Sequence, residues 1–574
     1  MRRILTILAA AILSTTLMPA QNDKEVVAVF ERTYVSTDKD SYVAGDRIWC
    51  SAFCFDAPSK TLSNTSAIAY VEVLSPYGDI LQSAKISIEG GRGGGYLDLP
   101  ESMPTGNYRL IAFTSVNRNE EGYDFLQNSK VISVLNSKSQ AKVKDKVEVV
   151  SDEIYSQRKE TVKSDAQTGD LAVKVPGFTK EGSPFSIDIE NTGSKPVSLS
   201  VSVYHEDAVA APEDKSIASF VIPSVQNARY TPEFKPETEG EIILATLSGK
   251  DRDEILRKET TATAYISSAG RDGDTYTSPI HPDGTISFST NNIYGNRELV
   301  TEIADLNDEK LIGLIDIQSP FVSVSSDVPL LSLSEGLSKA VVERGRQMQR
   351  FRMEYSDSLA QFKARKEDFP YVSPDANVYI LDDYTRFPTI REVLVEITTE
   401  VRVRGRNDKQ RIQVLTKDLE GDSGASMSWE NSLVLLDGVP VFKHKDMMDY
   451  DAMLLKEIHV WREKYVFGNR TFYGVVNFIS KRGNMAFMDF GSNVRIVDFQ
   501  GVCYPMEFTK KYAKDGNPDT RQTIFWKPEV EVGPQQSISL ECEAPDYFGR
   551  FSLVVEGVTQ DGEYIHKKAT FVVE

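Results

Sequence analysis

The sequence contains few of the residues that most often build metal centres and reactive nucleophile sites. It has four cysteines and five histidines among 574 residues. No His-Glu-x-x-His or Cys-x-x-Cys motif occurs, and the histidines lie far apart in the chain, whereas zinc sites need ligands at short, regular spacings. The sequence therefore predicts no metal, no cofactor and no enzyme activity.

Four cysteines allow at most two disulfides. Cys50 and Cys54 lie in the apolar stretch RIWCSAFCF, and four residues along a strand span about 13 Å, which is too far for a disulfide. We expect both to be core residues. Cys503 and Cys542 lie in one C-terminal segment and could close a loop worth about 4 kcal/mol. A disulfide between them and two free thiols are the alternatives.

Long apolar runs are absent beyond the N-terminus. Arg2 and Arg3 precede an apolar run, and Met18-Pro19-Ala20 provides a cleavage site, which is the pattern of a signal peptide over residues 1–20. No cysteine follows it to carry a lipid. No later segment reaches about 18 consecutive apolar residues, so we expect no transmembrane helix. The sequence predicts an exported protein.

Acidic residues outnumber basic ones. The chain has a formal net charge of −19, and without Arg2 and Arg3 the 63 remaining basic residues stand against 84 acidic ones, a charge of −21. Such a surface repels phosphate backbones and anionic membrane surfaces. Nucleic acid is therefore excluded as a partner.

What the chain has in abundance is short strand patterns separated by turn residues, which are typical of antiparallel sandwiches. Its length implies several domains, since single cores rarely exceed about 250–300 residues. We expect β-sandwiches at 23–136, 170–235, 236–330 and 485–574, a charged linker at 137–169, a helical connector at 331–377 and an α+β domain at 378–484. The predicted fold class is mainly β, with one α+β domain and a connecting helix.

The connector carries a helical repeat. LSEGLSKAVVERGRQMQRFRMEYSD places Leu337, Val341, Met348 and Phe351 close to a 3.6-residue period. We expect one helix packed on the α+β domain, and an arm for a partner helix is the alternative.

The α+β domain carries strong local signals. Thr389 stands three residues before Glu392, the spacing of a capping box, which predicts a helix from Ile390 to Ile397. The strand Leu433–Leu436 runs into Asp437-Gly438, a dipeptide that favours a tight hairpin turn. Strands are also expected at 458–461 and 475–479.

Several segments resemble known families. YVSTDKDSYVAGDRIW followed by LPESMPTGNYRLIAFT resembles the second macroglobulin (MG2) domain of the α2-macroglobulin family, an immunoglobulin-like β-sandwich, and RQTIFWKPEV with SISLECEA resembles a macroglobulin-type ending. LVLLDGVPV, KEIHVWREKYVFG and YGVVNFISKRG resemble the plug domain of TonB-dependent outer-membrane receptors. The combination resembles exported multidomain proteins of Gram-negative envelopes, which implies the periplasm or the outer membrane as its location.

The resemblance to a plug domain comes without a barrel. Only 91 residues follow Gly483, whereas a receptor barrel needs about 22 strands. We therefore expect the plug-like domain to act by binding a partner rather than by closing its own channel.

Sequence motifs that suggest catalysis are incomplete. Gly421-Asp422-Ser423-Gly424 resembles the nucleophile loop of chymotrypsin-like proteases, but a serine nucleophile also needs a histidine such as His459 and an acidic side chain beside it. We predict a polar turn instead. The glycine run 90–95 predicts a turn between strands, because no Lys-Ser or Lys-Thr follows it. The Cys-x-Glu-Gln thioester of protease-trapping macroglobulins is absent.

Together these features predict a non-catalytic interaction protein on the periplasmic side of the outer membrane. It would dock on a transport or assembly protein of that membrane, or on another copy of itself. The candidate contact residues are Asp437, Gly438, Trp461, Tyr465, Phe467, Phe472 and Tyr473, since interface energy concentrates in aromatic anchors. Packing inside the chain is the alternative for these aromatics. A macroglobulin-like protease inhibitor without a thioester, with residues 137–169 as its cleavable bait, is the second functional hypothesis.

Overall fold

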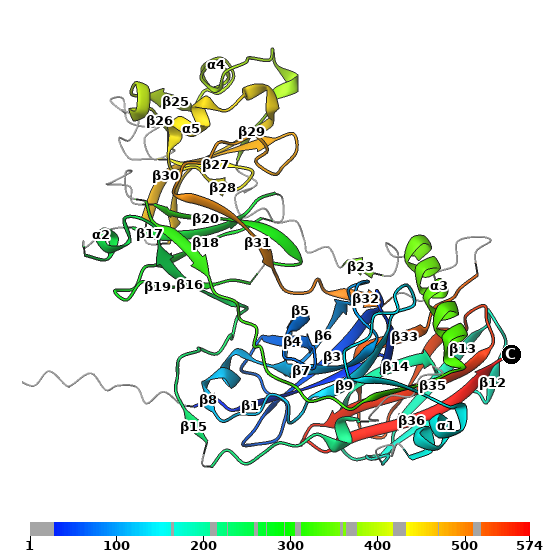
Figure 1. The fold of residues 1–574 in the computed structure, drawn as a ribbon. Helices are drawn as coiled ribbons and strands as arrows, with labels where there is room; N and C mark the ends of the chain where they lie inside the picture. The colour runs from blue at the N-terminus through cyan, green and yellow to red at the C-terminus, as the bar shows by residue number, and fades with distance from the viewer. Residues whose placement is uncertain are drawn as a thin grey trace, which may run out of the picture.

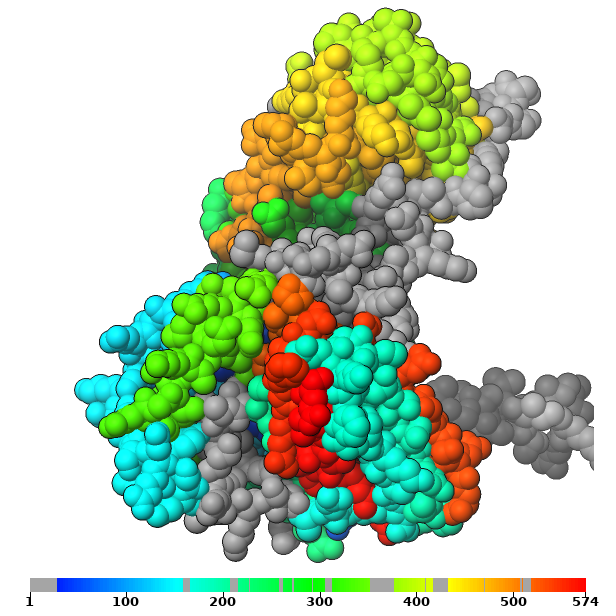
Figure 2. Space-filling view, turned by 90° about the vertical axis from the view of Figure 1, so that its right-hand side faces the viewer, coloured from blue at the N-terminus to red at the C-terminus, as the bar shows by residue number. Residues whose placement is uncertain are grey.

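The protein has two lobes, one above the other in Figures 1 and 2. The computed structural model describes residues 28–161, 166–206, 215–226, 228–257, 262–270, 273–291, 293–304, 312–355, 360–362, 376–416, 432–468, 470–508 and 518–574. The described chain is mainly β and forms several sheets, as predicted. The lower lobe, called the base lobe here, holds the blue, cyan and red parts of the ribbon, and the upper or arm lobe holds most of the green, yellow and orange parts.

The first sandwich, in the base lobe, is built from consecutive strands. Its two sheets have the strand orders β1-β3-β6 and β2-β9-β7-β4-β5. Cys50 and Cys54 point into its core, as the apolar pattern of their strand predicts. The strands are β1 Glu31–Thr37, β2 Ser41–Val43, β3 Arg47–Asp56, β4 Ile68–Leu74, β5 Ile80–Ser87, β6 Arg92–Asp98, β7 Gly106–Phe113 and β9 Lys130–Leu135, and η1 covers Ser115–Asn119.

The glycine run of the first sandwich is only partly a turn. Gly90 and Gly91 have positive φ angles of 59° and 76°, but the next glycines lie inside β6. A Cβ atom on Gly95 would stand 2.6 Å from Cγ1 of Ile86, and one on Gly94 would stand 2.5 Å from Cγ of Pro528. The prediction of a turn over the whole run is therefore wrong, because glycine is needed in β6 for close packing.

The third sandwich, also in the base lobe, is formed from two distant parts of the chain. Its sheets have the orders β11-β13-β34 and β12-β36-β35-β14-β33. The strands are β11 Leu171–Lys174, β12 Phe178–Thr179, β13 Pro184–Asn191, β14 Val197–His205, β33 Thr523–Val532, β34 Ser537–Glu543, β35 Gly549–Thr559 and β36 Tyr564–Val573.

This pairing corrects the separate sandwiches predicted at 170–235 and 485–574. β13 pairs with β34 from Pro184↔Glu543 to Glu190↔Ser537, and β14 lies between β33 and β35. Neither segment alone supplies two complete facing sheets, so each buries its apolar side chains against the other.

The second sandwich begins the arm lobe and also takes a strand from the C-terminal segment. Its sheets have the orders β19-β16-β21 and β18-β17-β20-β31, in which β31 was predicted to belong to the C-terminal sandwich. The elements are β16 Ile242–Ser248, α2 Arg252–Arg257, β17 Thr263–Ser268, β18 Thr275–Pro279, β19 Thr285–Ser289, β20 Asn296–Ala304, β21 Leu314–Ile317 and β31 Val494–Gln500.

The α+β domain completes the arm lobe. Its five-stranded sheet has the order β24-β29-β30-β27-β28, and β25 pairs with β26 beside it. Its elements are β24 Asn377–Ile380, η3 Leu381–Asp383, α4 Ile390–Glu396, β25 Val401–Arg404, η4 Asn407–Lys409, β26 Arg411–Val414, β27 Leu433–Leu436, β28 Val439–Pro440, α5 His444–Asp449, η6 Ala452–Leu454, β29 Leu455–Phe467 and β30 Arg470–Ser480. The predicted capping box is confirmed, since the side chains of Thr389 and Glu392 each bond the other's backbone N–H.

The segment predicted as a linker contains regular structure. β10 Val147–Val150 pairs in parallel with β22 Leu331–Ser334, and α1 Asp152–Thr161 follows it. Tyr155 is buried against Leu331 and Leu337. This charged segment folds because its few apolar side chains are buried against β22, a strand far away in the sequence.

The predicted helix is present but lies elsewhere than expected. α3 Leu337–Tyr355 packs on β2 and β22 in the base lobe. Arg344 on this helix forms a buried ion pair of 3.3 Å with Asp46. The expected packing on the α+β domain is therefore wrong, since this ion pair and Met348 fix the helix on the other lobe. The remaining elements are η2 Ile217–Ser219 and the short pairs β8 Glu120–Glu121 with β15 Arg229–Tyr230 and β23 Ala360–Phe362 with β32 Met506–Phe508.

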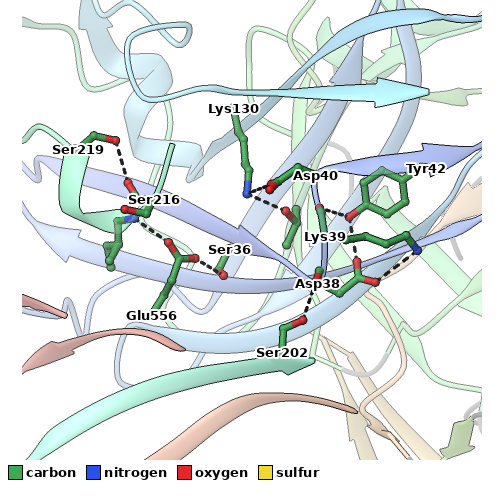
Figure 3. Close-up of polar contacts among 12 residues, drawn as sticks. Ser36, Asp38, Lys39, Asp40, Tyr42, Lys130, Ser202, Ser216, Ser219 and Glu556 are labelled. Carbon is green, nitrogen blue, oxygen red and sulfur yellow. Dashed lines mark hydrogen bonds and ion pairs between the residues drawn. The ribbon is translucent and has the colours of Figure 1, made fainter. Parts of the chain in front are cut away.

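Buried polar contacts join the first and third sandwiches (Figure 3). The carboxylate of Glu556 on β35 accepts hydrogen bonds from the hydroxyl of Ser36 on β1 and from the backbone N–H of Ile217, the latter at 2.8 Å. The hydroxyl of Ser202 on β14 donates to the carbonyl of Asp38 at 2.6 Å. Because buried polar groups need partners, these bonds fix one orientation of the two sandwiches.

Candidate interaction surface

The Asp437-Gly438 turn forms as predicted, but it lies inside the protein, where it contacts other parts of the same chain. Asp437 and Gly438 have φ angles of 51° and 86°, the left-handed pair that a tight hairpin turn requires. The Asp437 carboxylate is 1% exposed and accepts hydrogen bonds from the N–H and hydroxyl of Ser480, at 2.7 and 2.6 Å, and from the N–H of Met485 at 2.7 Å.

The same turn contacts the second sandwich. The carbonyl of Asp437 accepts from the N–H of Gly270 at 3.0 Å, and the carbonyl of Gly438 accepts from the hydroxyl of Thr275 at 3.3 Å. Both predicted contact residues therefore make their hydrogen bonds within the chain. Asp437 is too deeply buried to contact a partner protein.

The predicted aromatic anchors form an interface, but its other side is the second sandwich. Phe467 and Phe472 are buried in a cluster with Tyr265 of β17, and Trp461 and Tyr465 are half-buried against it. The ring centroids of Tyr265 and Phe467 lie 5.7 Å apart. The hairpin of β29 and β30 thus packs against the second sandwich. These four aromatic side chains therefore pack inside the chain, which was the alternative to contact with a partner protein.

Tyr473 does not join this cluster. Its ring is half-buried, with the ammonium of Lys464 5.5 Å from its centroid. Its carbonyl accepts a hydrogen bond from the hydroxyl of Ser432 at 2.6 Å. The structure therefore places it in the domain's own packing.

Of the two alternatives for Cys503 and Cys542, the structure shows the one without a disulfide, because the two cysteines belong to different cores. Cys503 packs on the first sandwich, and its thiol donates to the carbonyl of Tyr96 at 3.4 Å. Cys542 is buried in the third sandwich. Neither forms a disulfide, and burial raises the pKa of Cys503 to about 11.

The catalytic motif cannot be placed beside its hypothetical partner. Ser423 lies outside the described residues, whereas Nε2 of His459 is 2.9 Å from the carboxylate of Glu457. The buried Nδ1 of His444 accepts the backbone N–H of Ile412 at 2.9 Å, and burial lowers the pKa of His444 to about 3. Among the described residues, no group of three His, Cys, Asp or Glu side chains could hold a metal ion.

An exposed apolar edge, missed by the sequence analysis, lies on the α+β domain. β24 ends the five-stranded sheet and pairs only with β29 in the described part of the chain. Val378 and Ile380 on this strand are 48% and 45% exposed, and Tyr384 just beyond it is 44% exposed. The signal in the sequence was the alternation in NVYI, which places the apolar Val378 and Ile380 on one side and the polar Asn377 and Tyr379 on the other.

The other side of β24 is fixed inward by a carboxylate. Glu400 accepts hydrogen bonds from the hydroxyl of Tyr379 at 2.7 Å and from the amide of Asn377 at 2.8 Å. Burial alone would raise the pKa of Glu400, but these bonds and one from Thr399 outweigh it and lower the pKa. With Asn377 and Tyr379 held on one face, Val378 and Ile380 project from the other.

Comparisons with known proteins give fold likenesses only. No protein-family model matches the chain, and no curated protein matches its sequence. Among solved structures, Escherichia coli α2-macroglobulin activated by porcine elastase is 9% identical, with 95% of this chain and 44% of that chain covered and a TM-score of 0.24. Salmonella α2-macroglobulin reacted with methylamine is 10% identical, with 95% and 40% covered and a TM-score of 0.23.

A bacterial adhesin also matches. The Escherichia coli adhesin FdeC is 9% identical, with 50% of this chain and 64% of that chain covered and a TM-score of 0.14. The chain spans less than half the length of the macroglobulins. The class that the structure itself defines is a mainly β, multidomain protein of sandwiches with one α+β domain, and among its described residues no helix is long and apolar enough to cross a membrane.

Proposed function

We propose that this chain is a non-catalytic, exported interaction protein of a Gram-negative envelope. It works on the periplasmic side of the outer membrane and docks on a transport or assembly protein there. The observation that carries this proposal is the exposed apolar edge strand β24 on the arm lobe.

The chemistry of the edge defines the partner segment. An edge strand offers unpaired backbone groups, so an extended peptide can add to the sheet as a further strand. Val378 and Ile380 would contact apolar side chains at alternate positions of that peptide. Asp382 and Asp383 follow β24 and are exposed, and Asp382 pairs with Arg386 at 3.5 Å, so a basic residue near the end of the added strand would face Asp383.

Two further observations support a binding role. Edge strands of soluble proteins are usually blunted by charge or covered, whereas β24 exposes two aliphatic side chains. It also lies at the end of its five-stranded sheet, where its one partner among the described strands is β29. The predicted signal peptide over residues 1–20, which lies outside the described residues, supports export.

Capture from solubilised envelopes tests this proposal. Tagged wild-type protein is compared with Val378→Lys and Ile380→Lys, and Val395→Lys on α4 serves as the matched control because Val395 is 61% exposed on the same domain. We expect an outer-membrane protein, identified by mass spectrometry, with wild type and the control and at least tenfold less with either edge variant. Equal recovery with all four proteins, or no outer-membrane protein with any, would overturn the proposal.

A further inference from the structure

The two lobes meet through buried carboxyl groups that neither the fold nor the proposed docking accounts for. Glu72 lies on β4 of the first sandwich, and Glu237 and Glu241 lie on the segment that leads into the arm lobe. All three side chains are buried.

Hydrogen bonds satisfy only part of this cluster. One oxygen of Glu237 accepts from the hydroxyl of Tyr70 and from the N–H of Ile242, both at 2.8 Å. One oxygen of Glu72 accepts from the N–H of Val322 at 2.8 Å. The second oxygen of Glu72, Glu237 and Glu241 has no hydrogen-bond partner among the described residues. Buried acceptors without partners are rare and costly.

The positive charges at this contact are fewer than the carboxyl groups. Lys85 on β5 pairs with Glu241, and its ammonium lies 4.1 Å from the ring centroid of Phe499. Arg118 of η1 is the other cation near Glu72 and Glu237, with its guanidinium 3.7 Å from the ring centroid of Phe234. The three buried carboxyl groups, together with the exposed Glu233 beside Arg118, thus outnumber the two cations at the contact.

Protonation relieves this imbalance. Burial raises the pKa of Glu237 to about 8 and that of Glu72 to about 7, and it raises the pKa of Glu241 against the opposing effect of Lys85. A cavity of about 400 Å³ beside Lys85, lined among others by Phe321 and Arg495, opens the contact on one side.

We propose that the contact between the lobes is a proton-dependent hinge, closed when Glu72 and Glu237 carry protons and loosened when they ionise. Three chain passages near the contact would bend: residues 236–241, 318–322 and 500–503. The passage at residues 500–503 is tied to the base lobe by two hydrogen bonds that Gln500 on β31 and Ser83 on β5 exchange, at 3.0 and 2.6 Å, and by the N–H of Cys503, which donates to the carbonyl of Lys85 at 2.7 Å.

The direction of the pH effect follows from linkage. In an open hinge both carboxyl groups would be hydrated and would titrate near pH 4.5, so the closed form binds protons more tightly than the open form. Closure is therefore fully favoured below about pH 4.5, weakens as the pH rises toward 7 and 8, and is constant above. Each group changes the ratio of closed to open molecules by up to about tenfold per pH unit in that window.

Small-angle X-ray scattering of the full chain between pH 5 and 9 tests this proposal, with far-UV circular dichroism to confirm that the domains stay folded. We compare wild type with Glu237→Gln, with Glu72→Gln and with the double variant, in which an amide of the same shape cannot ionise. Glu239→Gln is the matched control, because Glu239 lies in the same segment and is exposed.

We expect the radius of gyration of wild type and of the control to rise with pH, with a smaller rise in each single variant and none in the double variant. A wild type of constant size would overturn the proposal, as would a double variant or a control that breaks this pattern. If one of the two single variants does not fold, the other still tests the proposal, because its radius of gyration should rise less with pH than that of wild type. The scattering experiment needs no partner protein. A negative result would therefore refute the hinge and leave the docking proposal to the capture experiment.

Discussion

At the scale of single residues, Asp437 shows how one buried carboxylate holds a loop in place. Replacing it by alanine leaves the N–H and hydroxyl of Ser480 and the N–H of Met485 without their acceptor. Since each unsatisfied buried group costs about 1–3 kcal/mol, we expect Asp437→Ala to lower the free energy of unfolding by about 3 kcal/mol. Urea unfolding followed by tryptophan fluorescence measures this loss.

Asp437→Asn separates hydrogen bonding from backbone geometry. Asparagine keeps one acceptor and also tolerates a positive φ angle, so we expect a loss of about half that of alanine. The control is Asp382→Ala, because Asp382 is exposed and should change stability by less than about 0.5 kcal/mol. If Asp437→Ala were as stable as this control, the internal role of Asp437 would be refuted.

Residue-level features were predictable only where they are local. The capping box of Thr389 and Glu392 and the turn at Asp437-Gly438 involve neighbours within three residues, and both are confirmed. The partners of the Asp437 carboxylate lie more than 40 residues away, and no spacing rule reaches them. The sequence could not predict the unpaired oxygens of Glu72 and Glu237 either, because the residues around them are also distant in the chain.

At the scale of elements, strand β6 joins the first sandwich to the third. A methyl group on Gly94 would meet Cγ of Pro528 at 2.5 Å and the indole of Trp526 at 3.0 Å. We expect Gly94→Ala to destabilise the base lobe by about 1–3 kcal/mol, because overpacking forces the two sandwiches apart. Differential scanning calorimetry of the whole chain detects this as a lower melting temperature.

Gly177→Ala is the matched control for Gly94→Ala. A methyl group on Gly177 would meet nothing within 4 Å, so its melting temperature should equal that of wild type or exceed it slightly. Equal melting temperatures for both variants would show that β6 and β33 are not in close contact.

The aromatic side chains of the β29–β30 hairpin show why a strand is easier to predict than the surface against which it packs. The sequence indicated two strands with aromatic side chains, and both strands are present. Alternation tells which side chains share a face. It does not tell whether that face meets another protein or, as the Tyr265 cluster shows, another domain of the same chain.

At the scale of the whole molecule, the discontinuous third sandwich makes a direct prediction. Residues 485–574 supply β33–β36 to the third sandwich and β31 to the second. We expect this segment, produced alone, to be unfolded, and a chain ending at residue 484 to lose the fold of residues 171–205 as well. Circular dichroism of the first and limited proteolysis of the second measure these outcomes.

The control for the truncation is the full-length chain nicked by a specific protease at an engineered site near residue 484. Because β13 and β34 stay paired there, the nicked protein should keep its fold. A cooperative thermal transition of the isolated segment 485–574 would show instead that it is an independent sandwich.

The fold class followed from the sequence, but the domain pairing did not. Strand patterns and turns are local, so the first sandwich and the α+β domain could be outlined. The pairing of Phe185 with Cys542 joins residues more than 350 positions apart, and one sequence contains no record of that proximity. The sequence also left open whether Cys503 and Cys542 pair, because closeness in the chain does not show that they lie in different cores.

Site-specific photo-crosslinking in intact cells tests docking at β24 most directly. A photoreactive residue replaces Val378 on the exposed edge or, in the control, Val395 on α4. Our account predicts a crosslink from position 378, and not from position 395, to an outer-membrane protein, through an extended segment that mass spectrometry identifies. Equal crosslinking from both positions, or none to an outer-membrane protein from position 378, would contradict it.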